Sequence, residues 1–162
     1  GAPLRSRSAR PTLDLTRWER FPARINRFTG LSNGPFSELV LGELAGLTQF
    51  GVHLERLPPG SRSSFRHWHE TEDELIYVLA GEVTLVEDTE STLKAGDAAA
   101  WKAGVPVGHC LENRSLTEAT VLVVGTRAAR GVVHYADHDV VMHHDDGHRR
   151  FFRRDGSPWP EE

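Results

Sequence analysis

The sequence predicts an all-β protein, and three observations lead to that fold class. From Phe36 onward, short stretches rich in Val, Leu, Phe and Thr are separated by turn residues every eight to twelve positions. Glycine and proline are frequent, with 15 and 9 copies, which suits a chain with many turns. No long amphipathic helix pattern separates the stretches. The predicted strands suit a sandwich or closed barrel and cover residues 47–57, 64–68, 74–79, 82–86, 91–94, 98–102, 109–112 and 119–125.

Turn residues separate these strands in order along the chain. The segments PPG (58–60), AG (80–81), AGD (95–97) and GVPVG (104–108) each follow a predicted strand. Asp-Gly pairs at Asp146 and Asp155 predict two further tight turns, because Asp-Gly readily adopts the positive φ angles of hairpin turns. We therefore expect one barrel domain, residues 36–162, with a hairpin extension at its C-terminal end.

Residues 1–35 differ from the barrel segment in composition. They contain seven arginines against Asp14 and Glu19, and Pro11 and Pro22 interrupt any helical period. No helix-turn-helix pattern accompanies the arginines, so an anion-binding tail is the weaker hypothesis. We expect an irregular N-terminal arm that is solvated or packs against a dimer partner.

Composition and charge exclude several classes of protein. Apolar residues make up 38% and charged residues 26% of the 162 residues, which is typical of a globular domain rather than a disordered one. A formal net charge of -4 gives no general attraction to phosphate backbones or anionic lipid, so neither nucleic acid nor membrane is an expected partner. Cys110 is the only cysteine, which excludes an intramolecular disulfide. With no membrane-span or secretory pattern, we expect a cytoplasmic protein.

The stretch HWHETEDE contains candidate metal ligands. His67 and His69 are two residues apart, so on a strand both rings project from the same face. Glu74 opens the next predicted strand after a polar turn and can return a carboxylate to that face. Asp73 competes for this role, but the seven-residue step from Glu74 to Gly81 favours Glu74.

His109 supplies a third imidazole, at the start of the strand that follows GVPVG. Three neutral imidazoles and one carboxylate suit one divalent metal ion: iron, manganese, nickel, cobalt, copper or zinc. A six-coordinate ion would keep two positions open for water, substrate or dioxygen. The competing interpretation is four unrelated polar residues on a half-exposed sheet.

Two longer segments resemble the two motifs of the cupin superfamily. GSRSSFRHWHETEDELIYVLAG resembles the first motif and GDAAAWKAGVPVGHCLENRS the second. Nearly the whole chain after Phe36 is similar to a group of small, stand-alone bacterial cupins. The resemblance implies a double-stranded β-helix, which is a jelly-roll-like barrel of two antiparallel sheets, usually a homodimer with the metal in the barrel mouth.

Other residues are weaker candidates for the site. His53 lies on the strand before the first motif and Tyr77 on the strand after Glu74. Both are candidate proton donors or acceptors, and ordinary packing is the competing and favoured interpretation for both. Strand alternation predicts that Cys110 points away from the metal as a buried thiol. The late histidines are expected to be exposed residues around the hairpin turn: His134, His138, His143, His144 and His148.

The predicted ligand set leads to three functional hypotheses. The leading one is a metal-dependent enzyme that acts on a small oxygen-rich molecule, of the isomerase, epimerase or lyase type, with the metal as a Lewis acid. A sugar-phosphate isomerase would belong to this class. The second is an iron-dependent dioxygenase, and the third is a non-catalytic cupin that binds or senses a small ligand. The fold by itself does not choose among them.

Overall fold

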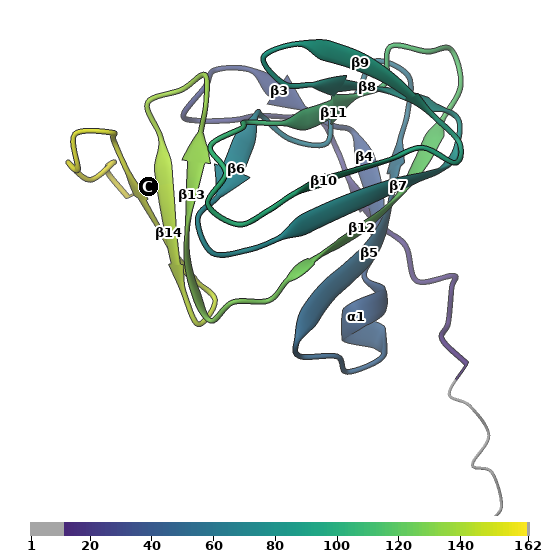
Figure 1. Cartoon of the computed structure of the whole chain (residues 1–162), viewed down its shortest axis with the longest axis horizontal. Coiled ribbons are helices and arrows are strands. Elements are labelled where there is room, and N and C mark those ends of the chain that lie inside the picture. Colours follow the sequence, from purple (N-terminus) through teal and green to yellow (C-terminus); the bar gives the residue numbers. More distant parts are fainter. Residues whose placement is uncertain (1–11, 162) are drawn as a thin grey trace, which may run out of the picture.

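A six-stranded antiparallel sheet is the largest element of the computed structural model, which describes residues 12–161. β12 lies at its centre, with β5 and β7 on either side. This arrangement brings together strands that lie far apart in the sequence (Figure 1). From one edge to the other the strands are β1 (Glu19–Phe21), β4 (Phe36–Leu39), β5 (Phe50–Leu57), β12 (Ala119–Thr126), β7 (Glu74–Ala80) and β10 (Ala98–Trp101).

Two smaller sheets complete the barrel. The first, in the order β11-β8-β9, forms a layer above β7 and β10 in Figure 1. The second, in the order β15-β14-β13-β6, lies at the end of the barrel where the C-terminal segment meets β6. Their strands are β6 (His67–His69), β8 (Glu82–Val86), β9 (Glu90–Lys94), β11 (Cys110–Glu112), β13 (Arg130–Tyr135), β14 (Val141–Asp145) and β15 (His148–Phe152).

The hydrophobic core fills the space between the large sheet and the three-stranded sheet. Strand alternation decides which side chains enter it: on β7, Ile76 and Val78 are buried, whereas Leu75 and Tyr77 face outward. Burial of such side chains contributes about 1.5–3 kcal/mol each. The core comprises Leu57, Ile76, Val78, Val83, Leu85, Trp101, Leu111, Ala119 and Val121.

The prediction of an all-β fold is confirmed, and each of the eight predicted strands overlaps an observed one. The largest difference is at residues 64–68, where the observed strand β6 covers only His67–His69. One short helix, α1 (Leu41–Leu44), packs against β5. Within residues 12–161, no helix has the length and apolar character needed to span a lipid bilayer.

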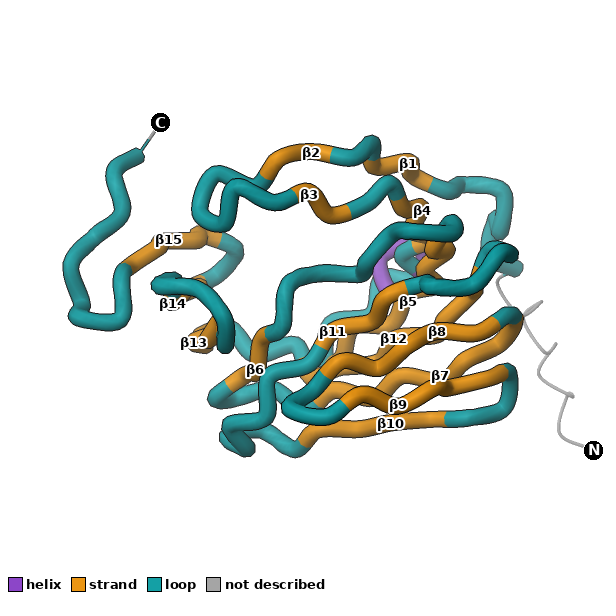
Figure 2. Tube along the Cα trace, turned by 90° about the horizontal axis from the view of Figure 1, so that it is seen from above, coloured by secondary structure: helices purple, strands orange, loops and turns teal. Residues whose placement is uncertain are grey.

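The N-terminal arm is more ordered than the sequence predicts. Its described part contains β1, which pairs with β4, and a hairpin of β2 (Arg24–Ile25) and β3 (Ser32–Asn33). Strands of two or three residues are too short to show an alternating pattern, so the sequence does not reveal them. The ring of Phe28 contacts that of Phe151 in a tilted arrangement with centroids 4.6 Å apart, so the arm packs against the C-terminal hairpin (Figure 2). Residues 1–11 of the predicted arm lie outside the described residues.

The C-terminal strands form a hairpin. β14 and β15 pair antiparallel around a turn in which Asp146 has a φ of 45° and Gly147 a φ of 85°. Positive φ at both central residues is what the hairpin turn of an Asp-Gly pair requires. The second Asp-Gly pair also forms a turn, closed by a hydrogen bond from the Gly156 amide to the Arg153 carbonyl.

Candidate metal centre

Three strands bring the four predicted ligands to one end of the barrel. His67 and His69 lie on β6, and Glu74 begins β7. His109 precedes β11, and its backbone exchanges two hydrogen bonds with His67, of 3.1 and 3.2 Å. This bridge joins the two motifs, which lie far apart in the sequence.

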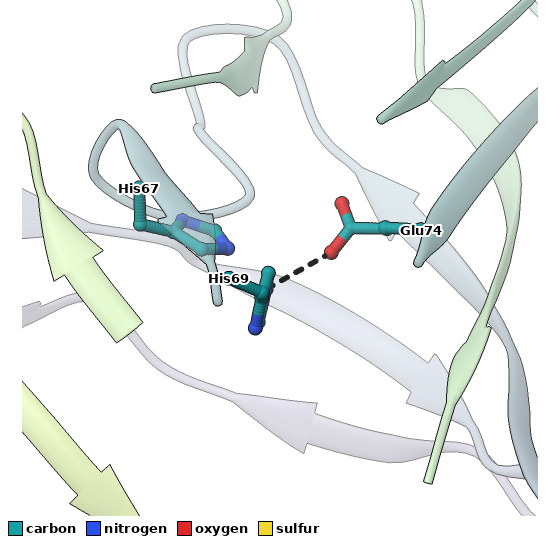
Figure 3. Close-up of side chains that lie close together, drawn as sticks. All are labelled: His67, His69 and Glu74. Atoms are coloured by element: carbon teal, nitrogen blue, oxygen red, sulfur yellow. Dashed lines mark ion pairs between the residues drawn. The ribbon is translucent and has the colours of Figure 1, made fainter. Parts of the chain in front are cut away.

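The Glu74 carboxylate lies between two of the imidazoles. Its Oε2 is 3.3 Å from Nε2 of His69, and its Oε1 is 3.1 Å from Nε2 of His109. Ligand atoms of His67, His69 and Glu74 all lie within 4.8 Å of one another, and Figure 3 shows these three side chains pointing toward one another. Asp73 faces outward and accepts a hydrogen bond from the Ala103 amide, which supports the choice of Glu74 over Asp73.

The second ring nitrogen of each histidine faces an oxygen atom outside the centre. Nδ1 of His67 lies 2.8 Å from the Phe65 carbonyl and Nδ1 of His109 lies 3.0 Å from the Val107 carbonyl. Because a carbonyl only accepts, these Nδ1 atoms donate and Nε2 is the nitrogen left for the centre. Nδ1 of His69 lies 3.3 Å from Oε2 of Glu72. An outer carbonyl or carboxylate of this kind is the usual partner of a metal-binding histidine.

Trp101 fixes the ring of His109. The two rings are stacked with centroids 3.6 Å apart and planes 4° apart, and the indole N–H donates to Glu87 Oε1 at 2.7 Å. Trp101 belongs to the core, and its packing also restricts the orientation of the His109 ring.

Burial and charge act in opposite directions on these groups. Burial lowers the pKa of His67 to about 4, although the negative charge of Glu74 acts to raise it. Burial also lowers the pKa of His69, but Glu72 and Glu74 outweigh it and raise that pKa to about 9. Burial raises the pKa of Glu74, and its contacts with His109 and His69 outweigh this and hold it well below its ordinary value. Glu74 is therefore an anion at neutral pH.

Unpaired buried polar atoms indicate that the group fits a metal ion. In the described part of the chain, three buried side-chain nitrogen or oxygen atoms lack a hydrogen bond: Nδ1 and Nε2 of His69, and Oε1 of Glu55. The contacts of His69 with Glu72 and Glu74 are close enough for ion pairing but lack hydrogen-bond geometry. Leaving such atoms unpaired costs about 1–3 kcal/mol each, and a cation bound at Nε2 would remove that cost.

A cavity of 370 Å³ opens beside the four ligands and lies in the size range of small-molecule sites. His53 lines it. Tyr77 does not, and the expectation that its hydroxyl reaches the site is corrected: its side chain is 40% exposed on the outer face of β7. The physical reason is the two-residue period of the strand, because Glu74 and Ile76 point inward and Tyr77 therefore points outward.

The cavity also contains residues that the sequence did not single out. Glu38 and Glu55 lie beside His53, and Tyr135 and Arg149 come from the C-terminal strands. The alternation of His53, Glu55 and Leu57 on β5 was a signal that Glu55 shares the inner face. No comparable signal marks Arg149, because its position depends on the pairing of β15 with β14 and of β13 with β6.

The remaining sequence expectations have mixed outcomes. Cys110 is buried, as expected, and burial raises its pKa to about 11. The late histidines are not all exposed, because only His148 is. His144 is packed against Glu72, with Nε2 3.8 Å from Oε1, and His134 stacks on Trp68 at 4.2 Å. These histidines belong to strands β13 and β14, whose pairing the sequence did not predict.

Comparisons with known proteins agree with this architecture. A family model described as "Cupin domain" matches residues 53–125. A crystal structure from Silicibacter pomeroyi, described as a sugar phosphate isomerase from a cupin superfamily, is 40% identical, covers 93% of this chain and 97% of the other, and has a TM-score of 0.82. A protein from Acidithiobacillus ferrooxidans, described provisionally as a sugar phosphate isomerase, is 26% identical over 78% of this chain and 81% of its own, with a TM-score of 0.72.

More distant similarity extends to the fold alone. A cupin 2 conserved barrel domain protein from Salinispora arenicola is 20% identical over 77% of this chain and 92% of its own, with a TM-score of 0.52. No curated protein matches the chain. The two sequence motifs, the two-layered barrel and the 40% identical relative all agree, and the chain belongs to the cupin superfamily.

Proposed function

We propose that the protein is a metal-dependent isomerase of a small phosphorylated sugar. The observation that carries the proposal is the group of three histidines and Glu74 beside a 370 Å³ cavity, in which both ring nitrogens of His69 are buried without a hydrogen bond. The descriptions of the relatives from Silicibacter pomeroyi and Acidithiobacillus ferrooxidans support the choice of an isomerase.

His67, His69, Glu74 and His109 would hold the metal ion. Bound there, the metal would act as a Lewis acid toward a carbonyl or hydroxyl oxygen of the substrate. The protein positions the ligands before binding, since Phe65, Val107 and Glu72 orient the rings. Apolar side chains on the cavity wall limit the entry of water: Ile76, Leu111, Val123, Val133 and Met142.

Arg149 supports a phosphorylated rather than a neutral substrate. It is the only lysine or arginine that lines the cavity, and no ion pair or hydrogen bond is found for its guanidinium among the described residues. A guanidinium binds phosphate oxygens through two parallel hydrogen bonds. We infer that Arg149 binds the phosphate group while the sugar carbons extend toward the metal centre.

Metal content and isomerase activity test the proposal together. Protein purified without a histidine tag is analysed by mass spectrometry for metal, for the native chain, for His67→Ala and for His148→Ala. We expect about one ion per chain in the native protein and in His148→Ala, whose histidine is exposed and outside the cavity, and loss of the ion in His67→Ala.

The metal-loaded protein is then assayed by NMR with a panel of aldose and ketose phosphates of three to six carbons. Interconversion of an aldose phosphate and its ketose, absent in His67→Ala, is the expected result. Oxygen consumption with iron(II) and no isomerisation would contradict the proposal and favour the dioxygenase hypothesis. Saturable binding of a ligand without turnover would favour a non-catalytic binding protein.

A further inference from the structure

A second group of ionisable side chains lies in the same cavity, apart from the metal centre. Glu38 on β4 pairs in register with Glu55 on β5, and His53 lies two residues before Glu55 on the same face. Candidate ligand atoms of the three residues lie within 4.8 Å of one another, and all three residues line the cavity. We call them the His53 cluster.

The sheet register places the His53 cluster on the same six-stranded sheet as Glu74, with one strand between them. His53 pairs with Val123 of β12, and Val123 pairs on its other side with Ile76 of β7, two residues after Glu74. One strand therefore separates the two groups, which corresponds to a backbone separation of about 10 Å. Glu74 and His53 line the same cavity, so a substrate bound there can contact both.

The contacts within the cluster distinguish the roles of its members. Nε2 of His53 is 3.5 Å from Oε2 of Glu55. No hydrogen bond or ion pair is found for Nδ1 of His53 within residues 12–161. The side chain of His53 is 27% exposed and that of Glu55 only 8%. His53 is thus more exposed than Glu55, although both line the cavity, and Oε1 of Glu55 is buried without a hydrogen bond.

The charges around His53 favour a histidine that exchanges a proton. Burial lowers the pKa of His53, but the contact with Glu55 and the charges of Glu55 and Glu38 outweigh it and raise that pKa. Burial raises the pKa of Glu38. The other ionisable groups that line the cavity are His67, His69, Glu74, His109, Cys110, Tyr135 and Arg149.

We propose that His53 is a catalytic residue that moves the substrate proton, and that Glu55 is its positioning residue. The inference rests on the proposed isomerase function and assigns the proton transfer within it. His53 lines the cavity and provides a ring nitrogen for which no partner is found within residues 12–161, and the buried carboxylate of Glu55 lies 3.5 Å from its other ring nitrogen and orients the ring. A histidine of this kind speeds proton transfer by about 10²–10⁴-fold.

The proton transfer conserves all atoms and electrons. The proton on C2 of the aldose moves to Nδ1 of His53, the C2–H electron pair forms the C1–C2 double bond, and the carbonyl π pair moves to O1. Nδ1 then returns the proton to C1, while the proton of the C2 hydroxyl moves to O1. The product is the ketose, with a carbonyl at C2 and a hydroxyl on C1.

Exchange of carbon-bound hydrogen tests the inference separately from isomerisation. Metal-loaded native protein, His53→Gln, Glu55→Gln and the control Glu43→Gln are incubated in D₂O with the aldose and ketose phosphate panel. The control residue lies on α1 with a side chain 68% exposed. Proton NMR follows both deuterium incorporation next to the carbonyl and formation of the isomer, and thermal unfolding and metal content are measured for each variant.

We expect His53→Gln to lose deuterium exchange by about 100-fold or more while it keeps its metal ion and its fold. In Glu55→Gln, the acidic limb of the kcat/KM profile should move to lower pH, because removal of the carboxylate lowers the pKa of His53. A purely structural role of Glu55 would not move that limb. Glu43→Gln should match the native protein.

The outcomes separate the inference from the proposed function. Exchange without isomer formation, lost in His53→Gln, would support the inference and contradict the isomerase. Isomerisation at native rates in folded, metal-loaded His53→Gln would overturn the inference alone, and a metal-loaded native protein with neither reaction would overturn both. A second metal ion per chain that is lost in Glu55→Gln would also overturn the inference, since the His53 cluster would then be a cation site.

Discussion

At the scale of single residues, an arginine without an ion-pair partner is a better candidate for ligand binding than one that already pairs with carboxylates. Arg114 pairs with two carboxylates at 2.6 and 2.8 Å, and Arg66 pairs with two at 2.6 and 3.1 Å. Within residues 12–161, no such partner is found for Arg149, which lines the cavity. An arginine whose charge is not balanced by the protein is available to a ligand. This contrast, rather than the number of arginines, identifies Arg149 as the phosphate-binding candidate.

Arg149→Ala should raise KM for a phosphorylated substrate by about 10- to 100-fold, because a hydrogen bond to a charged group contributes about 1.5–3 kcal/mol. The matched control is Arg150→Ala, whose side chain is on the same strand but does not line the cavity. Steady-state kinetics with the sugar phosphate and with the dephosphorylated sugar would check the prediction. An equal change for both substrates, or for both variants, would contradict it.

At the scale of elements, the turn between β7 and β8 depends on a glycine that lies close to the start of β12. Gly81 forms this turn with a φ of 76°, and a Cβ placed there would lie 2.6 Å from the Glu118 carbonyl oxygen and 2.9 Å from Cα of Ala119. Both neighbours are backbone atoms of the segment that enters β12, so they have little freedom to move. Only glycine satisfies both the backbone angle and the close approach.

Gly81→Ala should destabilise the protein by about 3 kcal/mol, from the strained φ and the backbone clash together. Gly96→Ala is the control: Gly96 also has a positive φ, of 95°, but a Cβ there would meet nothing within 4 Å. Gly96→Ala should destabilise the protein by only about 1–2 kcal/mol, because the positive φ is strained for alanine but no atom clashes with the new Cβ. Urea unfolding of the native protein, Gly81→Ala and Gly96→Ala measures their free energies of unfolding. Equal losses of stability in the two variants would show that a shift of the β12 segment relieves the clash at Gly81.

At the scale of the whole molecule, the metal centre connects parts of the barrel that have few other links. Its ligands come from β6, from β7 and from the residue before β11, and β6 belongs to the C-terminal sheet while β7 belongs to the six-stranded sheet. A metal ion bound by all four side chains would therefore join the two sheets, and a ligand that binds only the folded state stabilises it by mass action.

Metal at 100 times its dissociation constant should stabilise the folded protein by about 2.7 kcal/mol, which corresponds to a rise in Tm of about 5–10 °C for a chain of this size. Differential scanning calorimetry of the protein in the presence of a chelator, and again after addition of metal, would measure this rise in Tm. His67→Ala should show no rise under the same conditions. A rise of equal size in that variant would mean that the metal binds elsewhere.

The sequence by itself determined the strand pattern and the two motifs, and it predicted His67, His69, Glu74 and His109 as the metal ligands. Local rules are sufficient there: side chains two apart on a strand share a face, and turn residues mark where strands end. The expected homodimer stays a prediction, which sedimentation of the purified protein would test.

Only the tertiary structure decided the rest of the cavity. Glu38, Glu55 and Arg149 join the site because β4, β5 and the C-terminal strands pair with partners far away in the chain. The register of such pairs depends on long-range hydrogen bonds and packing, and a shift of one residue would turn every side chain to the other face. The same register placed Tyr77 on the outer face and His53 on the inner one, and a single sequence does not contain that information.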